Sequence, residues 1–215
     1  MHVIERLKRI VDLQSIKSAY FSESLFVGNY EKENSILGMI QEQWLWKYRD
    51  YIRGVILDMS TPRYWHEFVH KIASKVLISD LDGEEVEKMG HKSPTDIIHD
   101  FCKPYTEHKF DTIVCAGILE HCENPFSMIS VLSNALVSGG HLFIHTPYAY
   151  MDGHMNPDYW RFCYQGYIKL IETAGLTKVS YDRYIEIKEI FKSDIDIDMS
   201  GVYVAHGIVA KKEKE

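Results

Sequence analysis

Residues 110–146 constrain the fold of this chain more than any other segment. They read as a buried strand over Phe110–Cys115, an amphipathic helix from about Asn124 to Leu136, a turn at Ser138–Gly140 and a second buried strand over His141–Thr146. Strand, helix and strand in this order predict a parallel β-α-β unit, whose crossover is right-handed in nearly all cases. The chain therefore contains at least part of an open, parallel sheet.

Polar and reactive side chains follow both of these strands. One set lies in Cys115–His121 and the other in Thr146–Arg161, an aromatic segment that carries histidines. Ligands of open α/β sheets bind outside the carboxyl ends of the strands. We therefore expect the chemistry of the protein in these two segments.

The rest of the chain continues the alternation of strands and helices. Further strands are predicted over Val55–Asp58, Val76–Asp80, Thr95–Asp100, Leu176–Tyr184 and Val202–Ala210, and further helices over Tyr64–Ala73, Glu84–Met89 and Tyr164–Ala174. Five strands that alternate with helices, followed by a terminal pair, predict a doubly wound α/β sheet with helices on both faces. Residues 53–215 are expected to form this domain.

Two helices are predicted before the sheet begins, over residues 2–20 and from about Ser35 to Tyr51. Residues 1–52 are therefore expected to form an N-terminal helical cap. One interpretation is that the cap simply packs on the sheet, and the other is that it forms a lid over the substrate pocket. The two interpretations are compatible.

Composition limits the partners and the compartment. The net charge of −7 argues against broad nucleic-acid binding, which needs clustered Lys and Arg, so we expect no nucleic-acid partner. The chain shows no apolar run long enough to span a membrane and no secretory signal. Its four cysteines form no C-x-x-C pair and are expected to be reduced thiols in a cytoplasmic protein. Exposed aromatic residues permit a homodimer.

Four sequence motifs in residues 110–162 resemble those of class I S-adenosylmethionine-dependent methyltransferases, of the small, type 11-like kind. They are FDTIVCAGILEH, the helix that ends NALVSGG, the strand HLFIHTP and the run HMNPDYWRF, after which Cys163 stands where the family usually has Thr. The resemblance implies a seven-stranded Rossmann-like sheet of order 3-2-1-4-5-7-6, with the last strand antiparallel. It also implies S-adenosylmethionine as the cofactor.

The resemblance assigns the cofactor to the ends of the first four strands. Asp80, which ends the second strand, would bind the ribose, and Asp100 with Phe101 would bind the adenine. The alternative is that Asp80 or Asp100 only caps a helix or turn. The residues expected to bind the cofactor are Asp58, Met59, Ser60, Thr61, Arg63, Asp80, Leu81, Asp100, Phe101, Cys115 and Ala116.

The turn after the first strand departs from the family pattern. The family has a glycine-rich turn there, whereas this chain has Asp58-Met-Ser-Thr-Pro-Arg-Tyr-Trp65 with no glycine. Ser60 and Thr61 could supply hydroxyl groups instead, and Arg63 could pair with the carboxylate of the methionine moiety. This departure also favours a rival hypothesis, a non-catalytic methyltransferase-like binding or regulatory module with a degenerate cofactor pocket.

Candidate catalytic residues lie after the fourth and fifth strands. His154, in the H-x-x-P-x-D-Y-W-R-F run, is the first choice as base, and His121 is the second, although His121 could instead only hydrogen-bond the loop. A nucleophilic Cys115 or Cys163 is less favoured. No pattern indicates a metal site, and His141 and His145 are expected to be packed rather than metal ligands.

The substrate-binding candidates are His145, Tyr148, Tyr150, Asp158 and Arg161. For Asp158 and Arg161 we favour the alternative that they pair with each other and brace the loop. Together these observations predict an enzyme that methylates oxygen or nitrogen of a small polar acceptor, with sugar-like molecules among the candidates. A second rival is an enzyme that uses the same cofactor for other chemistry, or binds a different nucleotide.

Overall fold

The computed structural model describes residues 36–59, 69, 71–80, 95–149, 157–186 and 202–214. The helices predicted over residues 2–20 and Glu84–Met89 lie outside the described residues. Of the helix predicted over Tyr64–Ala73, the described residues Val69, Lys71 and Ile72 are helical.

Seven strands form one sheet in the order β3-β2-β1-β4-β5-β7-β6, which confirms the predicted order. Their bounds are β1 Val55–Asp58, β2 Lys75–Asp80, β3 Ile97–Ile98, β4 Phe110–Ala116, β5 Leu136–Pro147, β6 Leu176–Glu186 and β7 Tyr203–Lys212. Strands β1 to β5 pair in parallel, and β7 runs antiparallel to both β5 and β6. The sheet is therefore the predicted mixed, Rossmann-like one.

Two strands differ clearly in length from the prediction. The turn expected at Ser138–Gly140 is wrong, because these residues already belong to β5, which begins at Leu136. Gly139 has φ +78°, and the pairing of β4 with β5 shifts register between Phe110 and Thr112, so the strand enters the sheet through an irregular segment. Strand β3 is also shorter than predicted, with two residues at one edge of the sheet.

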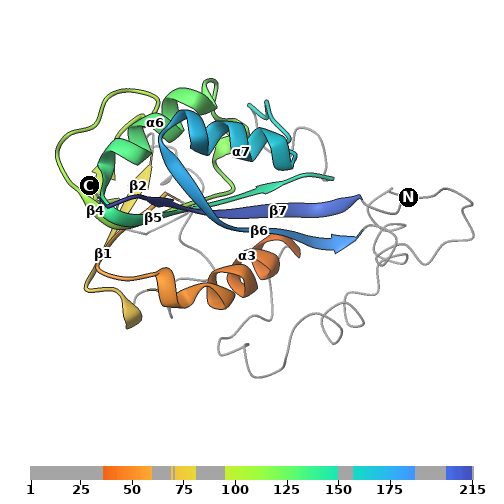
Figure 1. Ribbon diagram of the computed structural model, residues 1–215, viewed down its shortest axis with the longest axis horizontal. Coiled ribbons are helices and arrows are strands. Elements are labelled where there is room, and N and C mark those ends of the chain that lie inside the picture. The colour runs from red at the N-terminus through yellow and green to blue at the C-terminus, as the bar shows by residue number, and fades with distance from the viewer. Residues whose placement is uncertain are drawn as a thin grey trace, which may run out of the picture.

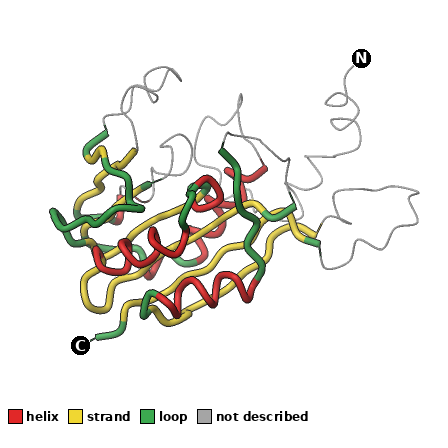
Figure 2. The backbone as a smooth tube through the Cα atoms, turned by 90° about the horizontal axis from the view of Figure 1, so that it is seen from above, coloured by secondary structure: helices red, strands yellow, loops and turns green. Residues whose placement is uncertain are grey.

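Helices cover both faces of the sheet (Figure 1). Helix α3 (Ile36–Lys47) lies on one face, and α6 (Pro125–Ala135) and α7 (Tyr164–Thr173) lie on the other, where Figure 2 shows them along the strands. Short 3-10 helices η2 (Arg49–Tyr51) and η3 (Leu119–His121) join strands to helices. No helix in the described part of the chain has the length and apolar character needed to cross a membrane.

Helix α6 begins where the sequence indicates. The side chain of Asn124 accepts a hydrogen bond of 3.0 Å from the backbone N–H of Ser127, and Pro125 occupies the first turn. At its other end the helix passes directly into β5 at Leu136. The crossover from β4 through α6 is therefore short, and it joins two strands that pair in parallel.

Helix α3 packs Trp44 against the sheet, whereas the role of residues 1–52 as a cap or a lid stays a prediction. Trp44 is fully buried, and its ring lies 5.5 Å from that of Phe143 in an edge-to-face arrangement. Opposite it, β7 carries Gly207, where a Cβ atom would stand 2.8 Å from the Trp44 ring. A small residue at position 207 is therefore what allows the helix to approach the sheet.

Two glycine-to-alanine substitutions are expected to change stability in opposite directions. Gly207→Ala should lower the free energy of unfolding by about 1–3 kcal/mol, because the new methyl group overlaps the rigid Trp44 ring. Gly166→Ala lies inside α7, where a Cβ meets ordinary contacts at 3.7 Å, and should raise it by about 0.5–1 kcal/mol. Urea unfolding of the two variants measures both; a neutral Gly207→Ala would contradict this packing.

Candidate active site

The first two strands each end in an aspartate, at the carboxyl end of the parallel sheet. Asp58 is the last residue of β1 and Asp80 the last of β2, and their strands are parallel neighbours. The Asp58 side chain is fully buried, and the next residue, Met59, donates its backbone N–H to the carbonyl of Val114 in β4 at 3.0 Å. These carboxylates are hydrogen-bond acceptors of the kind that ribose hydroxyl groups need, so the residues present fit a nucleoside-containing cofactor.

The segment after β3 is built differently from the expectation for an adenine site. Asp100 Oδ1 accepts a 2.9 Å hydrogen bond from the backbone N–H of Cys102, and this bond, assisted by Lys103, lowers the pKa of Asp100. Phe101 is buried, with its ring 5.0 Å from that of Tyr105. The capping alternative for Asp100 therefore describes its contacts, and adenine binding by Asp100 and Phe101 stays a prediction.

Six of the predicted site residues lie outside the described residues: Ser60, Thr61, Arg63, Leu81, Tyr150 and His154. The glycine-free turn and the first-choice base are among them, so their roles stay predictions.

A sharp turn at Gly117, directly after β4, positions the 3-10 helix η3. Gly117 has φ +72°, and its backbone N–H donates to the carbonyl of His145 at 2.9 Å. Only glycine adopts this conformation without strain. The side chain of Gln41, from α3, lies beside Gly117. The turn leads into η3, which presents Glu120 and His121 at the carboxyl end of the sheet.

The segment Pro157–Phe162, from the H-x-x-P-x-D-Y-W-R-F run, is fastened onto this turn. The backbone N–H groups of Tyr159 and Trp160 donate to the carbonyl of Glu120 at 2.8 and 3.2 Å. The indole N–H of Trp160 donates to the carbonyl of Cys122 at 2.8 Å. The two segments that the sequence marked as chemically active are thus joined by backbone hydrogen bonds.

His121 is oriented by the same segment. Its Nδ1 lies 2.5 Å from the carbonyl oxygen of Pro157. A carbonyl only accepts hydrogen bonds, so Nδ1 carries the proton, and in the neutral ring the lone pair is on Nε2, which is buried beside Glu120. The loop-bonding alternative and the base hypothesis for His121 are therefore compatible: one nitrogen is anchored while the other is basic.

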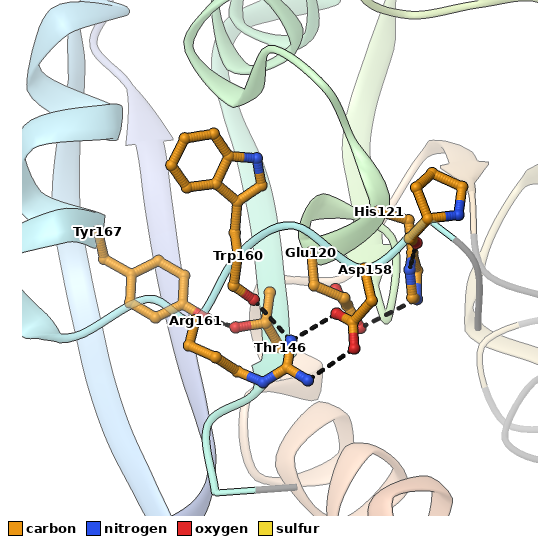
Figure 3. Close-up of polar contacts among 8 residues, drawn as sticks. Glu120, His121, Thr146, Asp158, Trp160, Arg161 and Tyr167 are labelled. Carbon is orange, nitrogen blue, oxygen red and sulfur yellow. Dashed lines mark hydrogen bonds and ion pairs between the residues drawn. The ribbon is translucent and has the colours of Figure 1, made fainter. Parts of the chain in front are cut away.

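Asp158 and Arg161 form a bidentate ion pair (Figure 3). The two guanidinium nitrogens lie 2.5 and 2.7 Å from the two carboxylate oxygens. Arg161 also donates to the carbonyl of Trp160 at 2.9 Å. The Asp158 side chain is almost fully buried and that of Arg161 is partly exposed. The favoured alternative, in which the pair braces the loop, matches these contacts, and substrate binding by either residue stays a prediction.

Glu120 was not among the residues predicted for the site, yet it lies beside His121. Its side chain is 1% exposed, and Oε1 lies 3.7 Å from Nε2 of His121. Burial raises the pKa of Glu120 to about 8, with Arg161 opposing part of that effect. The carboxyl group is therefore largely protonated at neutral pH and becomes a charged partner when His121 holds the proton. The signal in the sequence was a carboxylate in an apolar run, directly before a histidine.

This buried carboxyl predicts a pH-dependent stability. The pKa of Glu120 is about 8 in the folded chain and about 4.3 when unfolded, so the folded state binds more protons between these values and stability falls as pH rises through that window. Glu120→Gln removes this loss. The variant should gain on the order of a few kcal/mol over the wild type between pH 5 and pH 9, measured by urea unfolding. Parallel stability curves for the two proteins would contradict the burial of an ionisable group here.

The rings of His145 and Tyr148 pack against other aromatic side chains. His145 is fully buried beneath α3, with its ring 5.5 Å from Trp44 and 6.3 Å from Tyr184, and burial lowers its pKa to about 3. It is therefore neutral and packed, as one of the two sequence interpretations held. Tyr148 stacks on His206 at 4.4 Å. Substrate binding by His145 and Tyr148 stays a prediction, and the packing of His145 speaks against it.

Cys115 and Ala116 are buried at the end of β4. Burial raises the pKa of the Cys115 thiol well above its ordinary value, which disfavours the thiolate that nucleophilic catalysis requires. Within the described ranges, no group of three or more His, Cys, Asp or Glu side chains could hold a metal ion.

A buried hydrogen-bond network joins the end of β5 to α7, the elements that flank the segment containing residues 157–162. The Tyr167 hydroxyl donates to the carbonyl of His206 at 3.2 Å, and its oxygen lies 2.6 Å from the hydroxyl of Thr146. Thr146 is near the end of β5, and Tyr167 is in α7, so this buried network ties the strand before the loop to the helix after it.

Comparison with known proteins places this site in a family. Residues 60–144 match the family model described as a methyltransferase domain. The chain carries a class I S-adenosylmethionine-dependent methyltransferase domain. The predicted family is thereby confirmed, and the match supports the predicted enzyme class and cofactor.

Solved structures agree with this methyltransferase fold. An S-adenosylmethionine-dependent methyltransferase from Clostridium acetobutylicum aligns with a TM-score of 0.56 and 10% identity, over 94% of this chain and 99% of the other. One from Archaeoglobus fulgidus aligns with a TM-score of 0.60 and 13% identity, over 81% of this chain and 94% of the other. At this identity the likeness shows the fold.

Curated relatives correct one expectation about the methyltransferase domain. A tRNA U34 carboxymethyltransferase of Campylobacter concisus is 49% identical over 45 residues, which cover 21% of this chain and 16% of the relative. That of Campylobacter curvus is 44% identical over 50 residues, covering 23% and 17%. The match spans about a sixth of the length of these relatives. Both names point to a nucleic-acid substrate, so the expectation of no nucleic-acid partner, which rested on net charge, is wrong.

Proposed function

We propose that the methyltransferase domain transfers a methyl group from S-adenosylmethionine to an oxygen or nitrogen atom of a polar acceptor. The observation that carries the proposal is the attachment of residues 157–162 to η3, which orients His121 at the carboxyl end of the sheet. A base held by a backbone carbonyl at this edge suits proton removal from an acceptor next to the cofactor.

The cofactor would bind along the ends of β1 to β4. Asp80 would accept hydrogen bonds from the ribose hydroxyl groups, Asp100 would contact the adenine, and the segment after Asp58 would approach the methionine moiety. When bound, the cofactor supplies an electrophilic methyl group on a sulfonium. The protein's task is then to align the acceptor atom and to remove its proton.

His121 is the proposed base, because its basic nitrogen is defined by the Pro157 contact. As Nε2 takes a proton, the ring becomes positively charged beside the carboxyl group of Glu120, 3.7 Å away. The charged ring favours the carboxylate form of Glu120, whose proton passes to solvent, and this carboxylate stabilises the imidazolium. Glu120 is therefore a proposed positioning and charge-balancing residue. His154 remains the other proposed base.

Two acceptor classes follow from two different observations. The resemblance of the HMNPDYWRF run to small methyltransferases favours a small, hydroxyl- or amine-bearing molecule, with sugar-like compounds among the candidates. The names of the curated relatives favour a nucleoside in tRNA. Tyr159 and Trp160, which are 54% and 39% exposed, could stack on either a sugar ring or a base.

A transfer assay separates the two classes. The purified protein is incubated with methyl-labelled S-adenosylmethionine and either total tRNA or a panel of sugar nucleotides and small amines. Label in tRNA that nuclease digestion releases as a modified nucleoside supports the nucleic-acid acceptor. Label in the small molecules supports the other class. The His121→Ala variant serves as the control, because it should transfer label to neither. Absence of transfer to both classes by folded wild-type protein would contradict the proposal.

A further inference from the structure

Two cysteines from separate segments face each other beside the candidate active site. The Sγ atoms of Cys102 and Cys122 are 3.0 Å apart. Cys102 follows β3, Cys122 follows η3, and the two residues are 20 positions apart in the sequence. Cys122 is 6% exposed, whereas Cys102 is partly exposed. A reagent in solution would therefore reach Cys102 first.

Hydrogen bonds other than the thiol contact hold both segments in place. The hydroxyl of Ser127, in α6, donates to the carbonyl of Cys102 at 2.8 Å. The backbone N–H of Cys102 donates to Asp100, and the indole N–H of Trp160 donates to the carbonyl of Cys122. The sulfur atoms are therefore kept close by the fold, and moving from 3.0 Å to a bond of about 2.05 Å needs only a small approach.

We propose that Cys102 and Cys122 form a redox-active thiol pair, which a low-molecular-weight disulfide such as oxidised glutathione converts to an intramolecular disulfide. The Cys102 thiolate attacks one sulfur of the small disulfide, forms a mixed disulfide and releases one small thiolate. Cys122 then loses its proton to solvent and attacks the Cys102 sulfur, which releases the second thiolate. Two protein thiols are oxidised by two electrons, and one small disulfide is reduced to two thiols.

The surroundings of the pair set its pH dependence. Burial raises the pKa of the Cys122 thiol, and its contact with Cys102 acts in the same direction. The nearby groups are the buried Cys115 thiol and the Asp100 carboxylate, which Lys103 partly balances. The second, ring-closing step therefore becomes faster as pH rises above neutral.

A disulfide between Cys102 and Cys122 would connect two segments that carry candidate site residues. Cys102 directly follows Asp100 and Phe101, and Cys122 directly follows Glu120 and His121. A disulfide would tie the expected adenine side of the site to its catalytic side. The formation of the bond does not depend on the proposed function, so it can be tested without a substrate.

The test uses the full chain with Cys163→Ser as the background. Cys163 is exposed and precedes α7, where Ser is a favourable capping residue, so this change removes the accessible thiol without a cost in folding. Three thiols remain of the four in the sequence. The folded protein is treated with oxidised glutathione at pH 8, alkylated and digested for mass spectrometry.

The proposal predicts a fall from three free thiols to one and a linked peptide pair containing Cys102 and Cys122, two hydrogens lighter than the separate peptides. Adding Cys122→Ser should abolish the link and leave glutathione on Cys102. Three unmodified thiols, a link to Cys115, or a Cys102–Cys122 link that forms only in urea would each overturn the proposal.

Discussion

Replacing His121 by alanine is expected to lower kcat by about 10²- to 10⁴-fold, the usual contribution of a positioned general base. The affinity for S-adenosylhomocysteine should stay within about threefold of the wild-type value, because His121 lies after β4 while the expected ribose and adenine contacts lie after β2 and β3. The measurement combines initial rates, with the acceptor class that the transfer assay identifies, and calorimetric titration of the product cofactor.

His108→Ala is the matched control, because His108 is exposed and contacts Tyr105 away from the candidate base. It should keep both kcat and cofactor affinity. A His121→Ala variant with wild-type kcat would remove His121 from the mechanism and leave His154 as the remaining proposed base.

Replacing Trp44 by alanine is expected to lower the free energy of unfolding by about 3–5 kcal/mol, the range found when large aromatic side chains are removed from cores. The indole is fully buried between Phe143, His145 and Gly207, so its loss leaves a cavity beneath α3. For a chain of this size the melting temperature should fall by about 10 °C. Urea and thermal unfolding followed by circular dichroism measure both quantities.

Trp46→Ala tests whether burial rather than residue type causes this loss. Trp46 lies two positions further along α3 and is 38% exposed, with its ring against the guanidinium of Arg49. Its replacement should change stability by no more than about 0.5 kcal/mol. Equal losses in the two variants would show that α3 does not pack as described.

The parts of the fold that could be predicted are those encoded by local patterns. Strand β1 has the predicted bounds Val55–Asp58, and α6 begins within one residue of the predicted start at Asn124, because a short apolar run and an amphipathic helical pattern can be recognised in the sequence alone. The start of β5 at Leu136 was not predicted, since Ser138 and two glycines resemble a turn. Leu136 pairs with Phe110 of β4, and the Ser138 hydroxyl donates to the carbonyl of Glu213 just after β7, so contacts with distant segments override that local preference.

In the candidate site, too, the residues placed by local patterns could be predicted, and those placed by tertiary packing could not. The placement of Asp58, Asp80 and His121 could be predicted because they end strands or follow them, and parallel strands bring such residues to one end of the sheet; their roles stay predictions. Glu120 was missed because its burial arises only when residues 157–161 pack over η3. His145 illustrates the opposite case: its place near the end of β5 suggested a substrate contact, but its side chain lies on the face covered by α3.

Calorimetric titration of the purified protein with S-adenosylhomocysteine, beside an Asp80→Ala variant, tests the central claim most directly. The account predicts micromolar binding by the wild type and a loss of about 100-fold or more in the variant, because a carboxylate that accepts two hydroxyl hydrogen bonds is removed. Glu172→Ala, an exposed carboxylate change on α7, should bind like the wild type. Absence of binding by folded wild-type protein would contradict the account and favour a non-catalytic methyltransferase-like module.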